Sequence, residues 1–238
     1  MSDPTRPIPT QSADAVSQSQ ENPFDYHHQK EWRLESGDSQ SPIDIRREDV
    51  TPADYAPDEN DTIVVHVTGE GASVVDNGNT VQIVLANSTA TIRGRHFKLM
   101  QAHFHAPAEH TIDGVRHPLE GHFVFKAQDG RLAVIAVLYR EGVENEQFAV
   151  LVSAAQRDVR VPVDSFDAAA LVPATLNCYY HYLGSLTTPP LSENVEWYVL
   201  DEPVALSSAD IEAFRRHYAF NARDTQPLNG RPLLKYTL

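Results

Sequence analysis

Cysteine is almost absent from this sequence of 238 residues, because Cys178 is the only one. A single thiol cannot form an intrachain disulfide. A chain of this length can bury a core large enough to fold without such a bridge. We expect Cys178 to be a small buried hydrophobic residue.

Long apolar segments are also missing, since no run approaches the roughly 18 residues that a membrane-spanning helix needs. The first residues lack the basic and apolar regions of a secretory signal peptide. We therefore expect no membrane partner. We favour the cytoplasm, and a secreted protein whose leader has been removed is the alternative. The sequence leaves a homodimer open.

Positive charge is scarce, with 19 Lys and Arg against 33 Asp and Glu and a formal net charge of -14. Nucleic acid is a polyanion, and a protein this acidic repels it unless basic residues gather in one stripe. No such stripe is evident in the sequence. Nucleic acid is therefore excluded as an expected partner.

Large apolar side chains are nearly missing from residues 1–23, which are rich in Ser, Gln, Pro and Asp. Such a segment cannot bury enough apolar surface to offset the entropy of ordering. We predict a flexible N-terminal tail at 1–23 and one domain over residues 24–238.

Alternating, β-branched and aromatic residues dominate the middle of the chain and predict strands. Helical spacing is confined to residues 145–156 and 207–217, and Ser207 or Ser208 offers an N-cap for the second helix. The proline-rich run 185–191 predicts a loop. The pattern indicates a sheet-dominated fold with few helices. The predicted strands cover residues 62–67, 80–85, 89–93, 97–105, 120–126 and 132–139.

Three histidines form a candidate metal site. His103 and His105 share one face of a predicted strand because they are two residues apart, and His122 lies on a later strand. If these strands are neighbours, the three imidazoles converge. Three neutral nitrogen ligands suit catalytic zinc, because they leave one open position and the full charge of the ion to acidify water. Ordinary half-buried histidines are the alternative, which we favour for His66, His96, His181 and His217.

Polar residues stand two positions before two of these histidines. Gln101 precedes His103, and Glu120 precedes His122, so each can bind the second ring nitrogen of its histidine. An ordinary polar pair on a strand face is the alternative. The opposite face of the first strand is apolar and is predicted to pack into a core; it carries Met100, Ala102, Phe104 and Ala106.

Six segments, in chain order, resemble the α-class carbonic anhydrase family over about residues 24–238. The resemblance implies a mainly β fold (α+β by strict count). It implies a single domain around a large, twisted, mostly antiparallel sheet with a few short peripheral helices, and zinc at the bottom of a conical cleft. The segments are QSPIDI (40–45), DNG (76–78), QAHFHAPAEH (101–110), LEGHFVF (119–125), YLGSLTTPPL (182–191) and QPLNGR (226–231).

The resemblance implies zinc-dependent, reversible hydration of carbon dioxide to bicarbonate and a proton by zinc-bound hydroxide, with buffer as the proton acceptor. It assigns zinc to His103, His105 and His122, and it implies inhibition by aromatic sulfonamides. The other roles that it implies are orientation of hydroxide by Thr187 and Glu109, binding of bicarbonate by Thr188, an apolar wall of Val124, Leu132, Val134, Leu186 and Trp197, a water-organising side of Tyr26, Asn77 and Gln82, and support of His105 by the backbone carbonyl of Asn229.

The sequence departs from the family at Asn79, where fast members carry a histidine that shuttles protons. An amide cannot take up and release a proton near neutral pH, so we expect proton transfer to limit turnover. His27 or His28 near Tyr26 is a candidate substitute, although plain surface exposure is the simpler expectation for both.

Two other functions are open. His103, His105 and Glu109 also fit the first motif of a cupin-type metal enzyme, with Glu109 as a further ligand to iron or manganese. A catalytically silent relative that serves as a binding module is the other alternative. The cupin reading leaves the segment at 40–45 and the loop at 185–191 unexplained, and a silent relative typically lacks a ligand histidine.

Overall fold

The computed structural model describes residues 25–32, 37–52 and 62–237, so the predicted tail at 1–23 lies outside the described residues. Strands make up most of the regular structure. Its helices are η1 (Tyr26–Glu31), η2 (Arg47–Asp49), α1 (Glu146–Ala154), η4 (Ala168–Leu171) and α2 (Ser208–His217).

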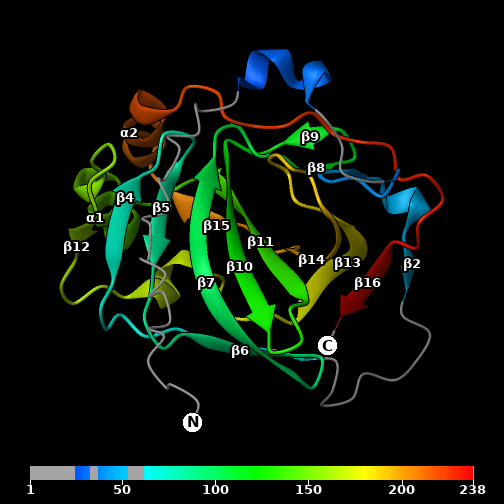
Figure 1. The fold of residues 1–238 in the computed structure, drawn as a ribbon, viewed down its shortest axis with the longest axis horizontal. Helices are drawn as coiled ribbons and strands as arrows, with labels where there is room; N and C mark the ends of the chain where they lie inside the picture. The colour runs from blue at the N-terminus through cyan, green and yellow to red at the C-terminus, as the bar shows by residue number, and fades with distance from the viewer. Residues whose placement is uncertain (1–24, 33–36, 53–61, 238) are drawn as a thin grey trace, which may run out of the picture.

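A small sheet and a large sheet contain the strands, and the large sheet fills the centre of the molecule (Figure 1). In chain order the strands are β1 (Asp44–Ile45), β2 (Thr51–Pro52), β3 (Ile63–His66), β4 (Ser73–Asp76), β5 (Val81–Val84), β6 (Thr89–Ile92), β7 (Arg95–His105), β8 (Thr111–Ile112), β9 (Val115–Arg116), β10 (Leu119–Ala127), β11 (Leu132–Glu141), β12 (Val161–Pro162), β13 (Cys178–Ser185), β14 (Glu193–Leu200), β15 (Val204–Leu206) and β16 (Leu234–Thr237).

The large sheet runs in the order β12-β4-β5-β7-β10-β11-β14-β13-β16-β2. Most neighbours are antiparallel, and the parallel pair β11–β14 lies at the centre. The predicted fold class is confirmed. All six predicted strands are present, and both predicted helices form.

The second predicted helix shows why its start was readable from sequence. The Ser207 hydroxyl accepts a hydrogen bond from the Asp210 amide, and the Asp210 carboxylate accepts one from the Ser207 amide. This capping box satisfies backbone donors that the first helical turn leaves free. Ser207, and not Ser208, is therefore the N-cap.

Two central strands, β13 and β14, were not predicted. Six of the eight residues in each strand are buried, so neither shows the alternation of a half-exposed strand. The predicted loop after β13 is confirmed, since β13 ends at Ser185.

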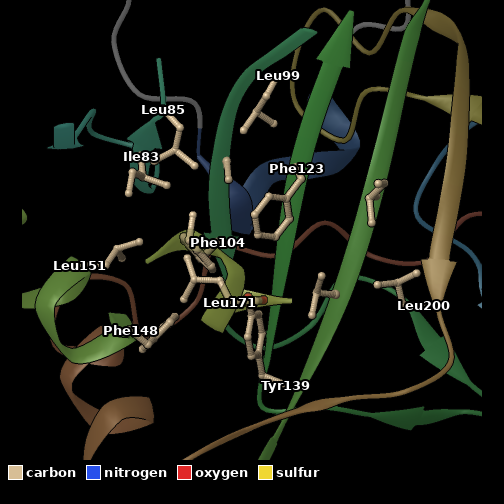
Figure 2. Close-up of a cluster of buried hydrophobic side chains, with 14 of the residues drawn as sticks. Ile83, Leu85, Leu99, Phe104, Phe123, Tyr139, Phe148, Leu151, Leu171 and Leu200 are labelled. Atoms are coloured by element: carbon tan, nitrogen blue, oxygen red, sulfur yellow. The ribbon is translucent and has the colours of Figure 1, made fainter. Parts of the chain in front are cut away.

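The large sheet has a separate core on each face. One core packs beneath α1 and α2 and contains Phe104 and Phe123 from the sheet and Phe148 from α1 (Figure 2). The other core contains Val134 and Trp197 and lies on the face that carries the histidines. Alternation along β7 and β10 therefore assigns apolar residues to the first core and imidazoles to the opposite face.

Met100 corrects the predicted alternation along β7. Val124 of β10 pairs with Gln101, whereas the next residue, Phe125, pairs with Leu99. Met100 is the extra residue of a β-bulge and is 46% exposed instead of packing into the core.

None of the helices among the described residues has the length and apolar character needed to span a membrane.

Candidate active site

Strand pairing brings the three histidines together. His122 of β10 lies directly opposite His103 of β7, and Glu120 lies opposite His105. The ring centroids are 5.0 Å apart for His103 and His105, 5.2 Å for His103 and His122, and 4.6 Å for His105 and His122. One candidate ligand atom from each ring lies within 4.8 Å of the others. The predicted convergence is confirmed.

Each ring uses one nitrogen to bind the protein. His103 Nδ1 lies 2.9 Å from Gln101 Oε1, and His122 Nε2 lies 2.8 Å from Glu120 Oε1. Carboxylate and carbonyl oxygens only accept, so these nitrogens donate. The second nitrogen of each ring, His103 Nε2 and His122 Nδ1, therefore carries a lone pair. Both predicted partners, Gln101 and Glu120, are found in place.

His105 is held by Asn221 and not by Asn229 as predicted. Its Nδ1 donates to the backbone carbonyl of Asn221 at 2.7 Å. Asn229 is exposed at a turn with φ 54°, and its side chain donates to Asp38 O. The prediction was wrong because the chain passes β7 at residue 221, where the Asn221 amide donates to Ala106 O at 3.0 Å.

The chemistry of the donor set fits zinc. His105 Nε2 is buried and has no hydrogen-bond partner among the described residues, which is costly unless a ligand occupies the position. Burial lowers the pKa of His105 to about 4 and lowers the pKa values of His103 and His122. Neutral imidazoles are the form that binds metal.

A second cluster of potential ligands is already satisfied by hydrogen bonds. His110 Nδ1 donates to Glu120 Oε1 at 2.7 Å, and His110 Nε2 is 2.7 Å from the Tyr182 hydroxyl. Glu120 Oε2 accepts the backbone amides of Glu109 and His110. Burial acts to raise the pKa of Glu120, but His110 and His122 hold it well below its usual value. Glu120 is therefore an ionised anchor for His122.

Glu109 lies beside the trio, with its Oε1 3.5 Å from His105 Nδ1 and its Oε2 3.9 Å from His122 Nδ1. Its Oε1 accepts the backbone amide of Arg223 at 2.7 Å. Burial raises the pKa of Glu109 to about 7, while His122, the Arg223 amide and the Thr187 hydroxyl act to lower it. Glu109 Oε2 has no hydrogen-bond partner among the described residues, so the predicted pairing of Thr187 with Glu109 stays a prediction.

The predicted apolar wall forms one cluster. Val124, Val134 and Trp197 occupy one row across β10, β11 and β14, because Val124 pairs with Val134 and Val134 with Trp197. Leu132 and Leu186 pack against the same core, partly buried. Thr188 is half-buried in the loop after β13, where its carbonyl accepts the Leu191 amide.

The predicted water-organising residues lie on neighbouring elements. Gln82 pairs with His103 across β5 and β7, and Asn77 Nδ2 donates to Gln82 Oε1 at 3.2 Å. Tyr26 is buried; burial, followed by the negative charge of Glu109, raises its pKa above its usual range. Asn79 accepts a hydrogen bond from Asn221 Nδ2 on its carbonyl.

The remaining histidines take no part in the trio. His66, His96 and His217 are exposed. His181 is buried, and its Nδ1 donates to Trp197 O at 2.9 Å. Cys178 is half-buried rather than buried.

Sequence reasoning missed Arg223, whose guanidinium donates to Gln40 Oε1 and Ser41 O while its amide binds Glu109. It also assigned no role to His110. The signal for His110 was its place in the segment 101–110. Arg223 and Asn221 gave no local signal, because their partners lie more than a hundred positions away in the sequence.

Comparisons with known proteins agree with this geometry. The family model for eukaryotic-type carbonic anhydrase matches residues 24–237. A carbonic anhydrase from Pectobacterium carotovorum is 42% identical over 210 residues, 84% of this chain and 81% of the relative.

Two solved structures are similar in fold. The α-carbonic anhydrase from Thermovibrio ammonificans, in complex with the inhibitor sulfanilamide, has a TM-score of 0.77 and 36% identity, covering 83% of this chain and 87% of that one. The Photobacterium profundum α-carbonic anhydrase has a TM-score of 0.76 and 37% identity, covering 84% and 90%. The family match and both folds favour this family over the cupin-type alternative. Sequence, fold and site agree that the chain belongs to the eukaryotic-type, α-class carbonic anhydrase family of enzymes that hydrate carbon dioxide.

Proposed function

We propose that this protein hydrates carbon dioxide reversibly to bicarbonate and a proton, using zinc held by His103 Nε2, His105 Nε2 and His122 Nδ1. One observation carries the proposal. Each of the three rings binds the protein through one nitrogen, and one ligand nitrogen from each ring lies within 4.8 Å of the other two. One of these nitrogens, His105 Nε2, is buried and has no hydrogen-bond partner among the described residues. When bound, zinc supplies the Lewis-acid chemistry that makes hydroxide available from water near neutral pH.

Thr187 and Glu109 orient the attacking oxygen in this proposal. An ionised Glu109 can only accept hydrogen bonds, so the Thr187 hydroxyl donates to it. The Thr187 oxygen is then left to accept a hydrogen bond from the nucleophile. This aims a nucleophile lone pair towards the substrate carbon, and such positioning lowers the barrier. The Arg223 amide fixes Glu109 at 2.7 Å.

The apolar row Val124, Val134 and Trp197 supplies the place for carbon dioxide. The substrate is apolar, and an apolar surface binds it without offering polar groups that would need to be desolvated. Thr188 follows Thr187 and would bind the bicarbonate product. Tyr26, Asn77 and Gln82 would order water on the other side of the histidines.

The released proton must leave the site, and Asn79 cannot carry it. Its amide does not titrate near neutral pH. We therefore expect saturated turnover to be limited by proton export. Added imidazole buffer, which carries protons, should raise the rate, and Asn79→His should do the same without added buffer.

Stopped-flow measurement of carbon dioxide hydration, combined with metal analysis, tests the proposal. We expect about one zinc per chain and activity that disappears with a chelator and returns with zinc. His103→Ala should abolish zinc uptake and hydration. His96 is an exposed histidine of the same strand, so His96→Ala should change neither.

Sulfanilamide is bound by the Thermovibrio ammonificans relative, and it should inhibit this protein. Hydration that survives both chelation and the His103 substitution would refute the metal assignment. A zinc-loaded protein without hydration activity would identify the silent binding module instead.

A further inference from the structure

Hydration releases a proton that must leave the site, and the residues assigned so far do not carry it to solvent. Each turnover releases one proton among side chains that are almost fully buried, such as His105, Glu109 and Glu120, each 0% exposed. The proton needs a nearby group that titrates near neutral pH and contacts solvent, which for an unperturbed side chain means histidine. The following inference rests on the proposed function.

The 3-10 helix η1, blue in Figure 1, lies next to the orange-red segment that follows α2 and hydrogen-bonds to it at residues 220–224. Gln29 Nε2 donates to Ala222 O at 3.1 Å, and the Asp224 amide donates to Gln29 Oε1 at 2.8 Å. Tyr26 at the start of η1 is buried, and burial, followed by the negative charge of Glu109, raises its pKa. The two hydrogen bonds of Gln29 therefore hold η1 against the segment 220–224.

The segment 220–224 is itself part of the site. Asn221 holds His105 through its carbonyl, and its side chain donates to Asn79 O at 3.1 Å. The imidazole of His27 stacks on the ring of Phe220, with centroids 5.8 Å apart and planes at 22°. His27 thus follows Tyr26 in the sequence, and its ring packs on Phe220. Phe220 precedes Asn221, which binds both His105 and Asn79.

His27 and His28 differ in what their rings bind. His28 Nδ1 lies 2.5 Å from Asp25 Oδ2, and this hydrogen bond raises the pKa of His28. Both ring nitrogens of His27 are without hydrogen bonds among the described residues, and the residue is exposed. Water can therefore deliver a proton to one nitrogen of His27 while the other releases a proton.

The charged groups around His27 lie on η1, with its N-cap Asp25, and on the segment 220–224. Asp25 accepts the His27 amide at 2.8 Å, and it is also paired with His28. Arg223 on the packed segment is buried, and its guanidinium is bound to Gln40 and Ser41. The other ionisable groups on these two elements are Lys30, Glu31 and Asp224.

We propose that His27 carries the proton released at the active site to buffer. Carbon dioxide and water give bicarbonate and a proton. Bridging water passes this proton to one ring nitrogen of His27. A buffer base then removes the proton from the other nitrogen, which restores the neutral imidazole for the next turnover.

The first test separates proton export from chemistry in the zinc-loaded enzyme, measured in a buffer that contains no imidazole. His27→Ala should lower kcat by about an order of magnitude or more and leave kcat/KM unchanged. The matched control, His28→Ala on the same helix, should change neither constant. Added imidazole should restore kcat of the His27→Ala enzyme, and so should a second substitution, Asn79→His.

The second test needs no turnover. Cobalt(II) replaces zinc, and its unpaired electrons speed the relaxation of histidine ring protons by an amount that falls steeply with their distance from the metal. We expect faster relaxation for the His27 ring than for the His28 ring. Equal or slower relaxation at His27 would overturn the proposal.

Other kinetic results also decide the matter. Unchanged kcat in His27→Ala overturns the proposal, and so does a parallel loss of kcat and kcat/KM, which would indicate a structural role. These failures leave the proposed function intact if the unsubstituted enzyme hydrates carbon dioxide in a zinc-dependent way. If the unsubstituted enzyme shows no such activity, the proposed function fails and this inference falls with it.

Discussion

Asn221 and Ala106 exchange two hydrogen bonds that fix the position of the site. The Asn221 amide donates to Ala106 O at 3.0 Å, and the Ala106 amide donates to Asn221 Oδ1 at 2.7 Å. Ala106 follows His105, so this pairing sets the Asn221 carbonyl against the His105 ring at 2.7 Å. One residue from near the C-terminus thereby determines which nitrogen of His105 is available to a metal.

Asn221→Ala tests this relationship. The substitution leaves the buried Ala106 amide and Phe104 carbonyl each without one partner, so we expect unfolding free energy to fall by about 1–3 kcal/mol. Looser support of His105 should weaken zinc binding by about 10- to 100-fold. Denaturant unfolding and competitive chelator titration measure the two effects.

Asn229→Ala is the control, because Asn229 is exposed and its side chain binds only a backbone carbonyl. We expect it to change stability by no more than about 0.5 kcal/mol. Equal zinc affinities in the two variants would contradict the role given to Asn221.

Val124→Phe tests the apolar wall. Val124 is half-buried on the face that carries His122, so a larger ring there should fill space that the substrate needs. We expect kcat/KM for hydration to fall about tenfold or more while zinc content stays the same. Val64→Phe, at a position 43% exposed on β3, should leave kcat/KM unchanged. A normal kcat/KM in the first variant would mean that carbon dioxide binds elsewhere.

Glu196 should make stability depend on pH in the acid range. Burial acts to raise its pKa, but hydrogen bonds from Arg95 and Tyr198 lower it to about 2 from 4.5. Because the folded pKa is the lower one, the stabilisation is fully present above pH 4.5 and is lost as pH falls towards 2. Arg95 is partly exposed, so we expect the contribution to be about 1–3 kcal/mol.

The measurement is urea unfolding of Glu196→Gln at several pH values. The variant should be less stable than the unsubstituted protein above pH 4.5, and the difference should shrink towards pH 2. Glu144→Gln removes an exposed carboxylate and serves as the control. A difference that does not change with pH would rule out this ionisation as its source.

Phe148→Ala tests the core beneath the helices (Figure 2). Phe148 is 0% exposed and packs edge-on against Phe104, with ring centroids 5.4 Å apart. We expect unfolding free energy to fall by about 3–5 kcal/mol, because the truncation leaves a cavity. Val150→Ala on the same helix, at a position 38% exposed, should cost far less. Similar losses in denaturant midpoint for both would show that α1 is not anchored by Phe148.

The sequence allowed prediction of features that depend on short-range pattern. His103 and His105 share a strand face because a strand repeats every two residues, and Gln101 lies on that face for the same reason. The capping box at Ser207 is equally local. The central strands β13 and β14 escaped prediction because they are buried on both faces and show no alternation.

The unpredicted part of the site depends on contacts between distant segments. Asn221 and His105 are 116 positions apart, and Arg223 and Glu109 are 114 apart. Nothing in the residues around Asn221 indicates which of several asparagines passes β7. Only the path of the folded chain distinguishes Asn221 from Asn229.

The bulge at Met100 has a consequence for how β7 tolerates change in length. Before it, the odd-numbered Phe97 and Leu99 face the core; after it, the even-numbered Ala102 and Phe104 do. Deleting Met100 would merge the two phases into one. Phe97, Leu99, Ala102 and Phe104 would then alternate without interruption on the core face, and His103 and His105 would stay on the opposite face. Strand β7 can therefore lose this one residue without exchanging its metal-binding and packing faces.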